Sequence, residues 1–385
     1  MLKFLLITTV AIFSLAMLWL WQENRAAENP VTFSVAQAMS GEESPDYLKA
    51  LQPRTFSFPG DLGPHPGFKT EWWYYTGNLT ADNGRRFGYQ FTIFRSALMP
   101  PSQVENSRPS QWAASQLYLG HFALSDLESG TFYSFEKISR EALGLAGARA
   151  FPFRVWVENW ITEAPVHAAG EVIPPLRIEA AEGPVQLKLD LQSRKPVVLQ
   201  GDRGLSPKSN RPGNASYYYS LTRLESAGEI RIGEERFTVS GLSWMDREWS
   251  TSALDSNQTG WDWFSLQLSD SSDLMVFQLR DHAGEQDFAK GSLVRPSGEV
   301  LPLQQSEIRL YPRRWWQSPA GVRYPVAWDL QIPAHHLDLR LEAAMDNQEL
   351  AVSIRYWEGA VDITGEQGGR AVSGRGYLEM TGYGP

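Results

Sequence analysis

Short runs of alternating apolar and polar residues fill most of the chain after residue 54. Arg86–Arg95 alternates directly after an Asp-Asn-Gly turn, and a Ser-Gly turn separates Leu117–Leu124 from Thr131–Phe135. A period of two places successive side chains on opposite faces of a strand, and the spacing typical of helices is scarce. The pattern therefore predicts an all-β protein built from short antiparallel strands.

The strand pattern occurs twice. Trp72–Leu79 (WWYYTGNL) aligns with Trp261–Leu268 (WDWFSLQL), and each string is followed by an Asp-containing turn and a strand that ends in arginine. Two further pairs of segments match: Arg177–Ala180 with Arg340–Ala343, and the segments that open at Val239-Ser240-Gly241 and Val372-Ser373-Gly374. An internal repeat of this kind predicts two copies of one structural unit.

Each copy holds enough strands for a closed sheet. Closure removes exposed strand edges, and small antiparallel barrels can hold one apolar ligand. We therefore predict two tandem lipocalin-like antiparallel β-barrels, over residues 55–250 and 251–385. Loops at 97–115 and 203–216 enlarge the first copy.

The N-terminus predicts the compartment. Lys3 precedes the uncharged run Phe4–Trp21, which approaches the about 20 residues of a membrane span. We predict a signal peptide or membrane anchor at 1–22 and a polar linker at 23–54. The anchor is slightly favoured because no small-residue cleavage pattern lies at the right distance. Because Lys3 should stay cytoplasmic, we expect the rest of the chain on the periplasmic or extracellular side, anchored or secreted.

Composition narrows the possible functions. The chain has 15 Trp, 14 Tyr and 18 Phe, a large aromatic content that suits apolar pockets. A net charge of −9 argues against a nucleic-acid partner, and the absence of cysteine excludes disulfides and thiol catalysis. We expect no metal and no cofactor, since His335 and His336 are adjacent and would face opposite ways on a strand.

The first candidate for chemistry is Glu71, which directly precedes Trp72-Trp73-Tyr74. An apolar aromatic wall could raise the pKa of this carboxyl and make it a general acid. The favoured interpretation is that Glu71 pairs with an arginine at the barrel rim while the aromatic rings pack the core.

The second candidate is the segment Trp244–Trp249 (WMDREW). Alternation places Trp244, Asp246 and Glu248 on one face of a strand and Met245, Arg247 and Trp249 on the other. If the first face points into a barrel, two carboxyls lie near each other, one to donate and one to accept a proton. An ion-pair network that joins the two units is the equally weighted alternative.

Two further segments carry polar groups. His121 could act in acid–base chemistry, although a satisfied core histidine is the favoured interpretation. Tyr356–Val361 and Gly376–Tyr383 are expected to close the second barrel, with their aromatic rings packed and their glutamates paired.

Five segments together resemble a known family: Glu71–Gly77, His121–Leu124, Trp244–Ser250, Gly260–Phe264 and Gly376–Tyr383. They are similar to the family that joins carotenoid 1,2-hydratases (hydroxyneurosporene synthases) to secreted lipocalin-like proteins encoded near ABC transporters, some of them labelled predicted secreted hydrolases. The likeness runs from residue 55 to the end and implies tandem lipocalin-like barrels. The hydratase branch implies cofactor-free addition of water to an isolated double bond, with a histidine in the segment where this chain has Arg247.

The sequence therefore favours an exported protein that binds an apolar or lipid-like ligand and serves a membrane transporter, with ABC transporter components as partners. The alternative is a hydratase or a secreted hydrolase. The candidate catalytic residues are Asp246, Glu248, Glu71 and His121. The candidate ligand-binding residues are Trp72, Trp73, Tyr74, Trp244, Trp249, Trp261 and Trp263.

Overall fold

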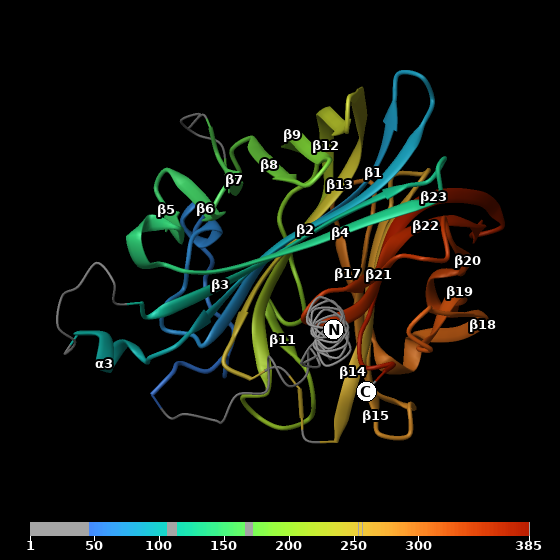
Figure 1. Cartoon of the computed structure of the whole chain (residues 1–385). Helices are drawn as coiled ribbons and strands as arrows, with labels where there is room; N and C mark the ends of the chain where they lie inside the picture. Colours follow the sequence, from blue (N-terminus) through green and yellow to red (C-terminus); the bar gives the residue numbers. More distant parts are fainter. Residues whose placement is uncertain (1–45, 106–113, 166–171, 253, 256, 385) are drawn as a thin grey trace, which may run out of the picture.

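The computed structural model describes residues 46–105, 114–165, 172–252, 254–255 and 257–384. The predicted signal peptide or anchor at 1–22 and most of the predicted linker lie outside these residues. In the described ranges, no helix has both the length and the apolar character needed to span a bilayer. The all-β prediction is confirmed, because two antiparallel barrel-like sheets make up most of the described chain (Figure 1).

The first sheet contains every strand up to Ser250. Its strands are β1 (Thr70–Ala81), β2 (Arg86–Ala97), β3 (Gln116–Asp126), β4 (Thr131–Arg140), β5 (Ala146–Ala150), β6 (Phe153–Val157), β7 (Trp160–Glu163), β8 (Leu176–Glu182), β9 (Val185–Ser193), β10 (Val198–Leu199), β11 (Leu205–Pro207), β12 (Ala215–Ile232) and β13 (Glu235–Ser250). The order is β4-β3-β2-β1-β13-β12-β9-β8-β7-β6-β5, with β10 and β11 against β12. The end strands β4 and β5 contact each other and close the barrel.

The second sheet begins at Gln258. Its strands are β14 (Gln258–Leu268), β15 (Asp273–Asp281), β16 (Gln286–Val294), β17 (Val300–Gln304), β18 (Arg309–Gln317), β19 (Arg323–Ile332), β20 (Leu337–Ala343), β21 (Glu349–Ala351), β22 (Arg355–Gln367) and β23 (Arg370–Met380). The order is β17-β16-β15-β14-β23-β22-β20-β19-β18, with β21 against β22. The short helices are η1 (Gly60–Leu62), α3 (Pro101–Glu105), η2 (Ala142–Gly144), η3 (Gln305–Glu307) and η4 (Pro333–His335).

The two sheets repeat one topology. In each, the first strand pairs with the second and with the last: β1 lies between β2 and β13, and β14 lies between β15 and β23. The predicted match between Arg177–Ala180 and Arg340–Ala343 is off by one strand. Arg177–Ala180 lies in β8, whereas Arg340–Ala343 lies in β20, and β20 occupies the position in the second sheet that β9 occupies in the first. Similar strand sequences on neighbouring strands of an antiparallel sheet make such a slip easy.

Side chains pack the interior of each barrel. Trp73 and Tyr75 of β1 belong to the buried core of the first barrel, and Trp328 and Trp357 belong to that of the second. A third buried cluster lies between the barrels and includes Tyr74, Tyr218, Trp244, Trp263, Phe277 and Tyr377. Because side chains alternate along β1, Trp73 faces the first core while Tyr74 faces the second barrel.

A buried aspartate ties the barrels together at one end. A register shift between Leu221 and Leu224 interrupts β12 and turns Thr222 and Arg223 outward. Thr222 donates to Asp273 at 2.8 Å, and the Arg223 guanidinium donates to the other carboxylate oxygen at 2.6 Å. Lys195 adds a 2.8 Å ion pair to the same fully buried carboxylate. The β-bulge thus places one strand's polar side chains against the neighbouring barrel.

We expect Asp273→Ala to lower the free energy of unfolding by about 3–5 kcal/mol, since two cations lose their buried partner. The measurement is urea unfolding at neutral pH. Asp329→Ala is the matched control: Asp329 also pairs with two basic side chains, Arg313 and Arg340, but its side chain is 25% exposed, so its loss should cost only about 0–1 kcal/mol. Equal losses in the two variants would contradict the tie between the barrels.

Candidate functional site

Strand β13 divides its side chains between two environments. Met245 and Trp249 are in the core of the first barrel. Trp244, Asp246 and Glu248 share the opposite face, as the alternation predicts, but this face points outward to the second barrel. The alternative in which the two carboxyls lie inside a barrel is therefore wrong, and they instead line a cavity between the barrels.

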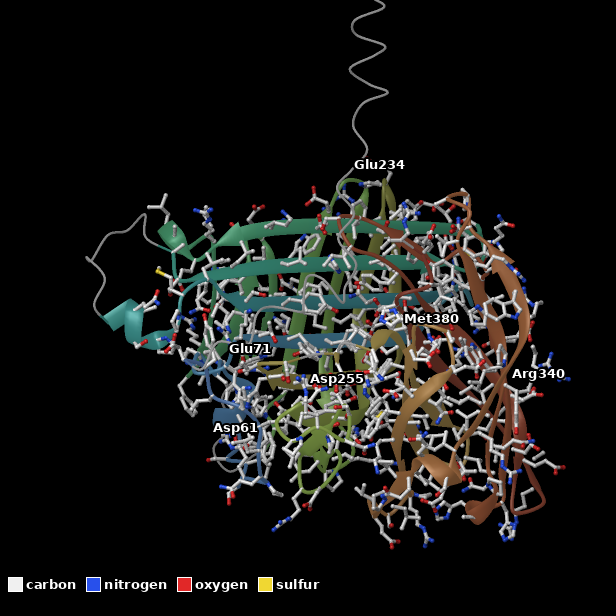
Figure 2. The ribbon with its side chains drawn as sticks, turned by 90° about the horizontal axis from the view of Figure 1, so that it is seen from below. Asp61, Glu71, Glu234, Asp255, Arg340 and Met380 are labelled. Atoms are coloured by element: carbon white, nitrogen blue, oxygen red, sulfur yellow. The ribbon has the colours of Figure 1, made fainter. Side chains whose placement is uncertain are left out.

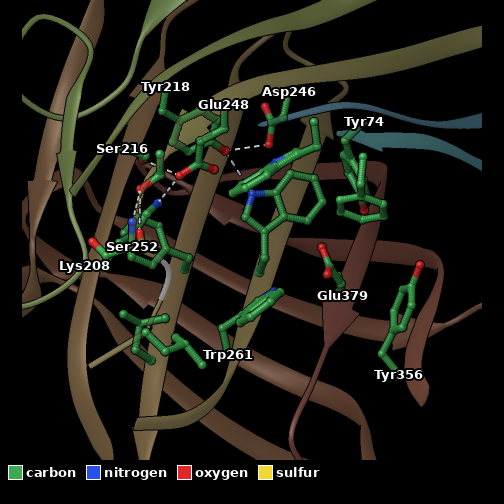
Figure 3. A pocket seen from close by; sticks show the side chains of 17 residues that line it. Tyr74, Lys208, Ser216, Tyr218, Asp246, Glu248, Ser252, Trp261, Tyr356 and Glu379 are labelled. Carbon is green, nitrogen blue, oxygen red and sulfur yellow. Dashed lines mark hydrogen bonds and ion pairs between the residues drawn. The ribbon is translucent and has the colours of Figure 1, made fainter. Parts of the chain in front are cut away.

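The cavity has a volume of about 90 Å³ and is mainly aromatic (Figure 3). Its lining residues are Trp72, Tyr74, Phe94, Lys208, Ser216, Tyr218, Asp246, Glu248, Ser250, Ser252, Leu254, Trp261, Trp263, Phe277, Leu279, Tyr356 and Glu379. Drug-sized ligands occupy pockets of about 300–1,000 Å³, so this space holds a small molecule or one end of a larger one.

Asp246 is held in a fixed orientation on one wall. Its Oδ1 accepts hydrogen bonds from Ser220 Oγ at 2.6 Å and Trp244 Nε1 at 2.7 Å, and its Oδ2 accepts one from the Tyr218 hydroxyl at 2.5 Å. Burial raises the pKa of Asp246 to about 7 despite these three donors, and the charge of Glu248 adds to the increase. Its carboxyl can therefore gain or lose a proton near neutral pH.

Glu379 of β23 faces the same cavity from the second barrel (Figure 3). Burial raises its pKa to about 8, the Trp261 side chain acts in the opposite direction, and the charges of Asp246 and Glu248 raise it further. In the described ranges, neither Asp246 nor Glu379 forms an ion pair with a basic side chain. Two carboxyls that titrate near neutrality thus share one small apolar space.

Glu248 differs from these two acids because it has a cation. Lys208 Nζ lies 2.7 Å from Glu248 Oε1, and Ser216 donates a short hydrogen bond to the same oxygen. The ammonium group also lies 4.6 Å from the centre of the Phe277 ring. Glu248 is therefore a partnered carboxylate at the edge of the cavity, and of the two predicted β13 acids Asp246 is the one free to exchange protons.

Glu71 lies outside the cavity, at one end of the first barrel (Figure 2). Its carboxylate pairs with Arg95 and Arg247, and the backbone N–H of His65 donates to both oxygens at 3.1 and 3.0 Å. Burial alone would raise its pKa, but the charges of Arg247 and Arg95 outweigh burial and hold the pKa far below its usual range. The raised pKa is therefore wrong, and the favoured interpretation, an ion pair with arginine, is what the structure contains.

His121 is fully buried between the barrels but does not line the cavity. Its Nδ1 lies 2.6 Å from the hydroxyl of Tyr356, which does line it, and its Nε2 lies 3.1 Å from Glu136 Oε2. The favoured interpretation as a satisfied core histidine agrees with these two contacts. They come from β22 and β4, so no sequence neighbour reveals them.

The predicted aromatic ligand-binding residues divide by strand face. Trp72, Tyr74, Trp261 and Trp263 line the cavity. Trp73 and Trp249 point into the first barrel's core, and Trp249 stacks on the His65 ring at a centroid distance of 3.7 Å. Trp244 lies behind Asp246 and donates to it. Alternation along β1 and β13 explains the division.

The sequence interpretation missed Glu379, although the internal repeat holds the signal. Aligning Val239-Ser240-Gly241 with Val372-Ser373-Gly374 places Asp246 opposite Glu379. The expectation that the glutamates near the C-terminus are paired is wrong: Glu358 is fully buried, and neither carboxylate oxygen has a hydrogen-bond partner in the described part of the chain. Lys208 was missed because a loop supplies it without any motif.

A metal-dependent site finds no support in the geometry. Among the described residues, no group of three or more His, Asp and Glu side chains is placed to hold a metal ion.

The fold and the cavity define a class: proteins of two lipocalin-like barrels with an acidic, aromatic-lined cavity between them. Residues 49–383 match the family model described as AttH-like, and the chain belongs to this family. A crystal structure of an AttH protein from Nitrosomonas europaea has a TM-score of 0.76 and 34% identity, and the match covers 88% of this chain and all of that one.

Two hydratase matches are more distant. Kievitone hydratase of Fusarium solani subsp. phaseoli is 27% identical over 176 residues, which cover 43% of this chain and 49% of that protein. The chain thus matches about half the length of this curated relative. The crystal structure of kievitone hydratase from Nectria haematococca has a TM-score of 0.64 at 16% identity, over 87% of this chain and 97% of that one, and supports the fold alone.

We expect Asp246→Asn to change how stability depends on pH. A folded-state pKa of about 7, above the usual 3.8, stabilises the native wild-type protein fully below about pH 4, and this contribution is lost as the pH rises through 7. The variant lacks this term, so its stability relative to wild type should increase by a few kcal/mol between about pH 4.5 and about pH 8. Urea unfolding at both pH values tests this, and a pH-independent difference would contradict the buried uncompensated acid.

Glu71→Gln should show the opposite sign. Its depressed pKa stabilises the fold fully above the usual value of 4.5, and this contribution is lost as the pH falls toward the low folded-state pKa. At neutral pH the variant should lose about 3–5 kcal/mol, because Arg95 and Arg247 keep no charged partner. The deficit should shrink in acid. A deficit that grows as the pH falls would rule out this ion-pair role.

Proposed function

We propose that the protein is a cofactor-independent hydratase or dehydratase that acts on an apolar molecule in the cavity between the barrels. One observation carries the proposal: Asp246 and Glu379 enter the same aromatic cavity from different barrels, with pKa values of about 7 and about 8. Pairs of acids whose environments give them different pKa values are typical of proton-transfer sites. The similarity to kievitone hydratase supports this reaction class.

The environments of the two acids assign their roles. Glu379, with the higher pKa, carries the proton near neutral pH and donates it to a carbon of the substrate double bond. Asp246 accepts three hydrogen bonds, which favours its ionised form, and takes a proton from the water whose oxygen bonds to the other carbon. Dehydration is the reverse of these steps. The site gives up one proton and gains one in each turnover.

The aromatic walls suit a positively charged transition state. Trp261 and Trp263 line the cavity beside Glu379, and ring faces attract cationic centres, more strongly when water is excluded. The volume of about 90 Å³ fits the reacting end of a substrate better than a whole extended lipid. We therefore propose that the substrate class is an apolar alkene or its alcohol, with only the functional end enclosed.

Arg247 does not count against this reaction. The resemblance implies a histidine in this segment for the hydratase branch, but Arg247 points into the first barrel, where it pairs with Glu71 and lies 4.0 Å from the centre of the Trp73 ring. It does not line the cavity. The acid groups proposed to transfer protons are those of Asp246 and Glu379, which do line the cavity.

A second candidate function is binding without chemistry, as the sequence favoured: an exported carrier of an apolar ligand that serves a transporter. The aromatic lining supports it, since four of the predicted ring systems face the cavity. Acids without a cationic partner distinguish the two proposals, because a carrier of apolar molecules gains nothing from burying such acids.

The test uses kievitone and geraniol as probes in H₂¹⁸O, with mass spectrometry of the products. We expect ¹⁸O-labelled alcohol from the wild type and a loss of at least about 100-fold in Asp246→Asn and Glu379→Gln, since each lacks one proton-transfer group. Asp262→Asn is the matched control, because Asp262 is buried on β14 but pairs with Arg280 outside the cavity. Tight binding of both probes without label incorporation would favour the carrier.

A further inference from the structure

Glu358 is a buried acid next to Glu379 that the proposed reaction does not use. It lies directly opposite Glu379 in the register of β22 and β23 and is fully buried. Neither of its oxygens has a hydrogen-bond partner in the described ranges, although the hydroxyls of Tyr74 and Tyr356 lie close enough to influence it. A buried carboxyl left in this state costs stability, which calls for a functional explanation.

Tyr356 lies beside this carboxyl and contacts a histidine that in turn contacts a partly exposed glutamate. It precedes Glu358 by two residues on β22, so both side chains lie on the same strand face. Its hydroxyl lies 2.6 Å from His121 Nδ1, and His121 Nε2 lies 3.1 Å from Glu136 Oε2. The Glu136 side chain is 18% exposed, whereas His121 is 1% exposed. Glu358, Tyr356, His121 and Glu136 therefore form a row that begins at a buried carboxyl and ends at one that reaches solvent.

The internal repeat shows that a pair of acids on neighbouring strands occurs in the second barrel only. Ser220 is the cross-strand partner of Asp246, just as Glu358 is that of Glu379. In the first barrel the Ser220 hydroxyl donates a hydrogen bond to Asp246. At the equivalent position beside Glu379, the second barrel has the acid Glu358. Asp246 also has the partnered Glu248 and Lys208 near it at the cavity edge, whereas Glu379 has the buried Glu358.

We propose that Glu358, Tyr356, His121 and Glu136 form a proton relay that connects Glu379 to solvent through side chains rather than through water in the substrate cavity. The proposal rests on the proposed function for its purpose but not for its geometry. The Glu136 carboxylate accepts the Nε2–H of His121, which leaves Nδ1 to accept the Tyr356 hydroxyl hydrogen.

The proton count balances along the row. Outward, the Glu358 proton passes to the Tyr356 oxygen as the tyrosine's own proton passes to Nδ1, and the Nε2 proton passes to Glu136. Each intermediate group gains one proton and loses one, and His121 ends with its proton on Nδ1. From that tautomer the reverse sequence runs: Glu136, protonated from solvent, passes a proton to Nε2, the Nδ1 proton passes to the Tyr356 oxygen, and the tyrosine's own proton reloads Glu358. Glu379 then regains its proton from Glu358 while the substrate still fills the cavity.

The test follows the buried protons directly, without substrate. The wild type is transferred rapidly from H₂O to D₂O, and the infrared carbonyl band of protonated buried carboxyls is followed; the Glu358 band is the one that Glu358→Gln removes. All variants are compared in a Glu379→Gln background, which removes exchange through the acid that faces the cavity. We expect Tyr356→Phe to slow deuterium exchange of this band by about tenfold or more, because exchange must then wait for local opening of the fold. Glu136→Gln, at the solvent end, should slow it as well.

Tyr74→Phe is the matched control. It removes a second hydroxyl beside Glu358 but leaves the contacts among Tyr356, His121 and Glu136 in place, so its exchange rate should equal that of Glu379→Gln alone. Unchanged exchange in both Tyr356→Phe and Glu136→Gln would overturn the relay, as would equal slowing in Tyr74→Phe. If Tyr356→Phe lowers the melting temperature, the Glu136→Gln result decides.

These outcomes are separate from those of the proposed function. A protein that forms no labelled alcohol but exchanges its Glu358 proton through Tyr356 retains the relay and loses the hydratase proposal. A protein that hydrates its substrate but exchanges this proton independently of Tyr356 and Glu136 retains the reaction and loses the relay.

Discussion

The site depends on the desolvation of carboxyl groups where two barrels meet. Burial is the largest influence on the pKa of Asp246, Glu358 and Glu379, and it raises all three. No lysine or arginine in the described ranges pairs with them, so the cost of burying charge remains as a raised pKa. Neither barrel alone would bury these groups, because each acid lies on an outer face that only the other barrel covers.

Glu71 shows what the same burial does when cations are present. It is as fully buried as these acids, but Arg95 and Arg247 reverse the direction of its pKa shift. The first barrel therefore contains a stabilising carboxylate inside and a proton-exchanging carboxylate outside, separated by the thickness of one sheet. The face of the strand decides which chemistry each acid has.

The sequence predicted the two barrels, because turn-bounded alternation and the internal repeat are local properties. It also placed Asp246 and Glu248 on one face correctly, since strand alternation requires only neighbouring residues. It could not decide which face is buried by the second barrel, and that uncertainty misassigned Glu71 and Trp73 to the site. Lys208 and Tyr218 reach the cavity through tertiary contacts that no local pattern contains.

The repeat also gives the site an approximate two-fold relationship. Tyr74 is the cross-strand partner of Asp246, and Trp263 is that of Glu379, yet each ring extends to the opposite barrel: Trp263 donates to Tyr218 at 3.1 Å, while Tyr74 lies beside Glu358. The two rings meet edge to face at 5.1 Å between centroids. Because each barrel's aromatic ring contacts the other's acidic network, the docking of the barrels and the protonation of the acids are coupled. A change that loosens the interface admits water, lowers both pKa values and removes the acid that the proposed reaction needs at neutral pH.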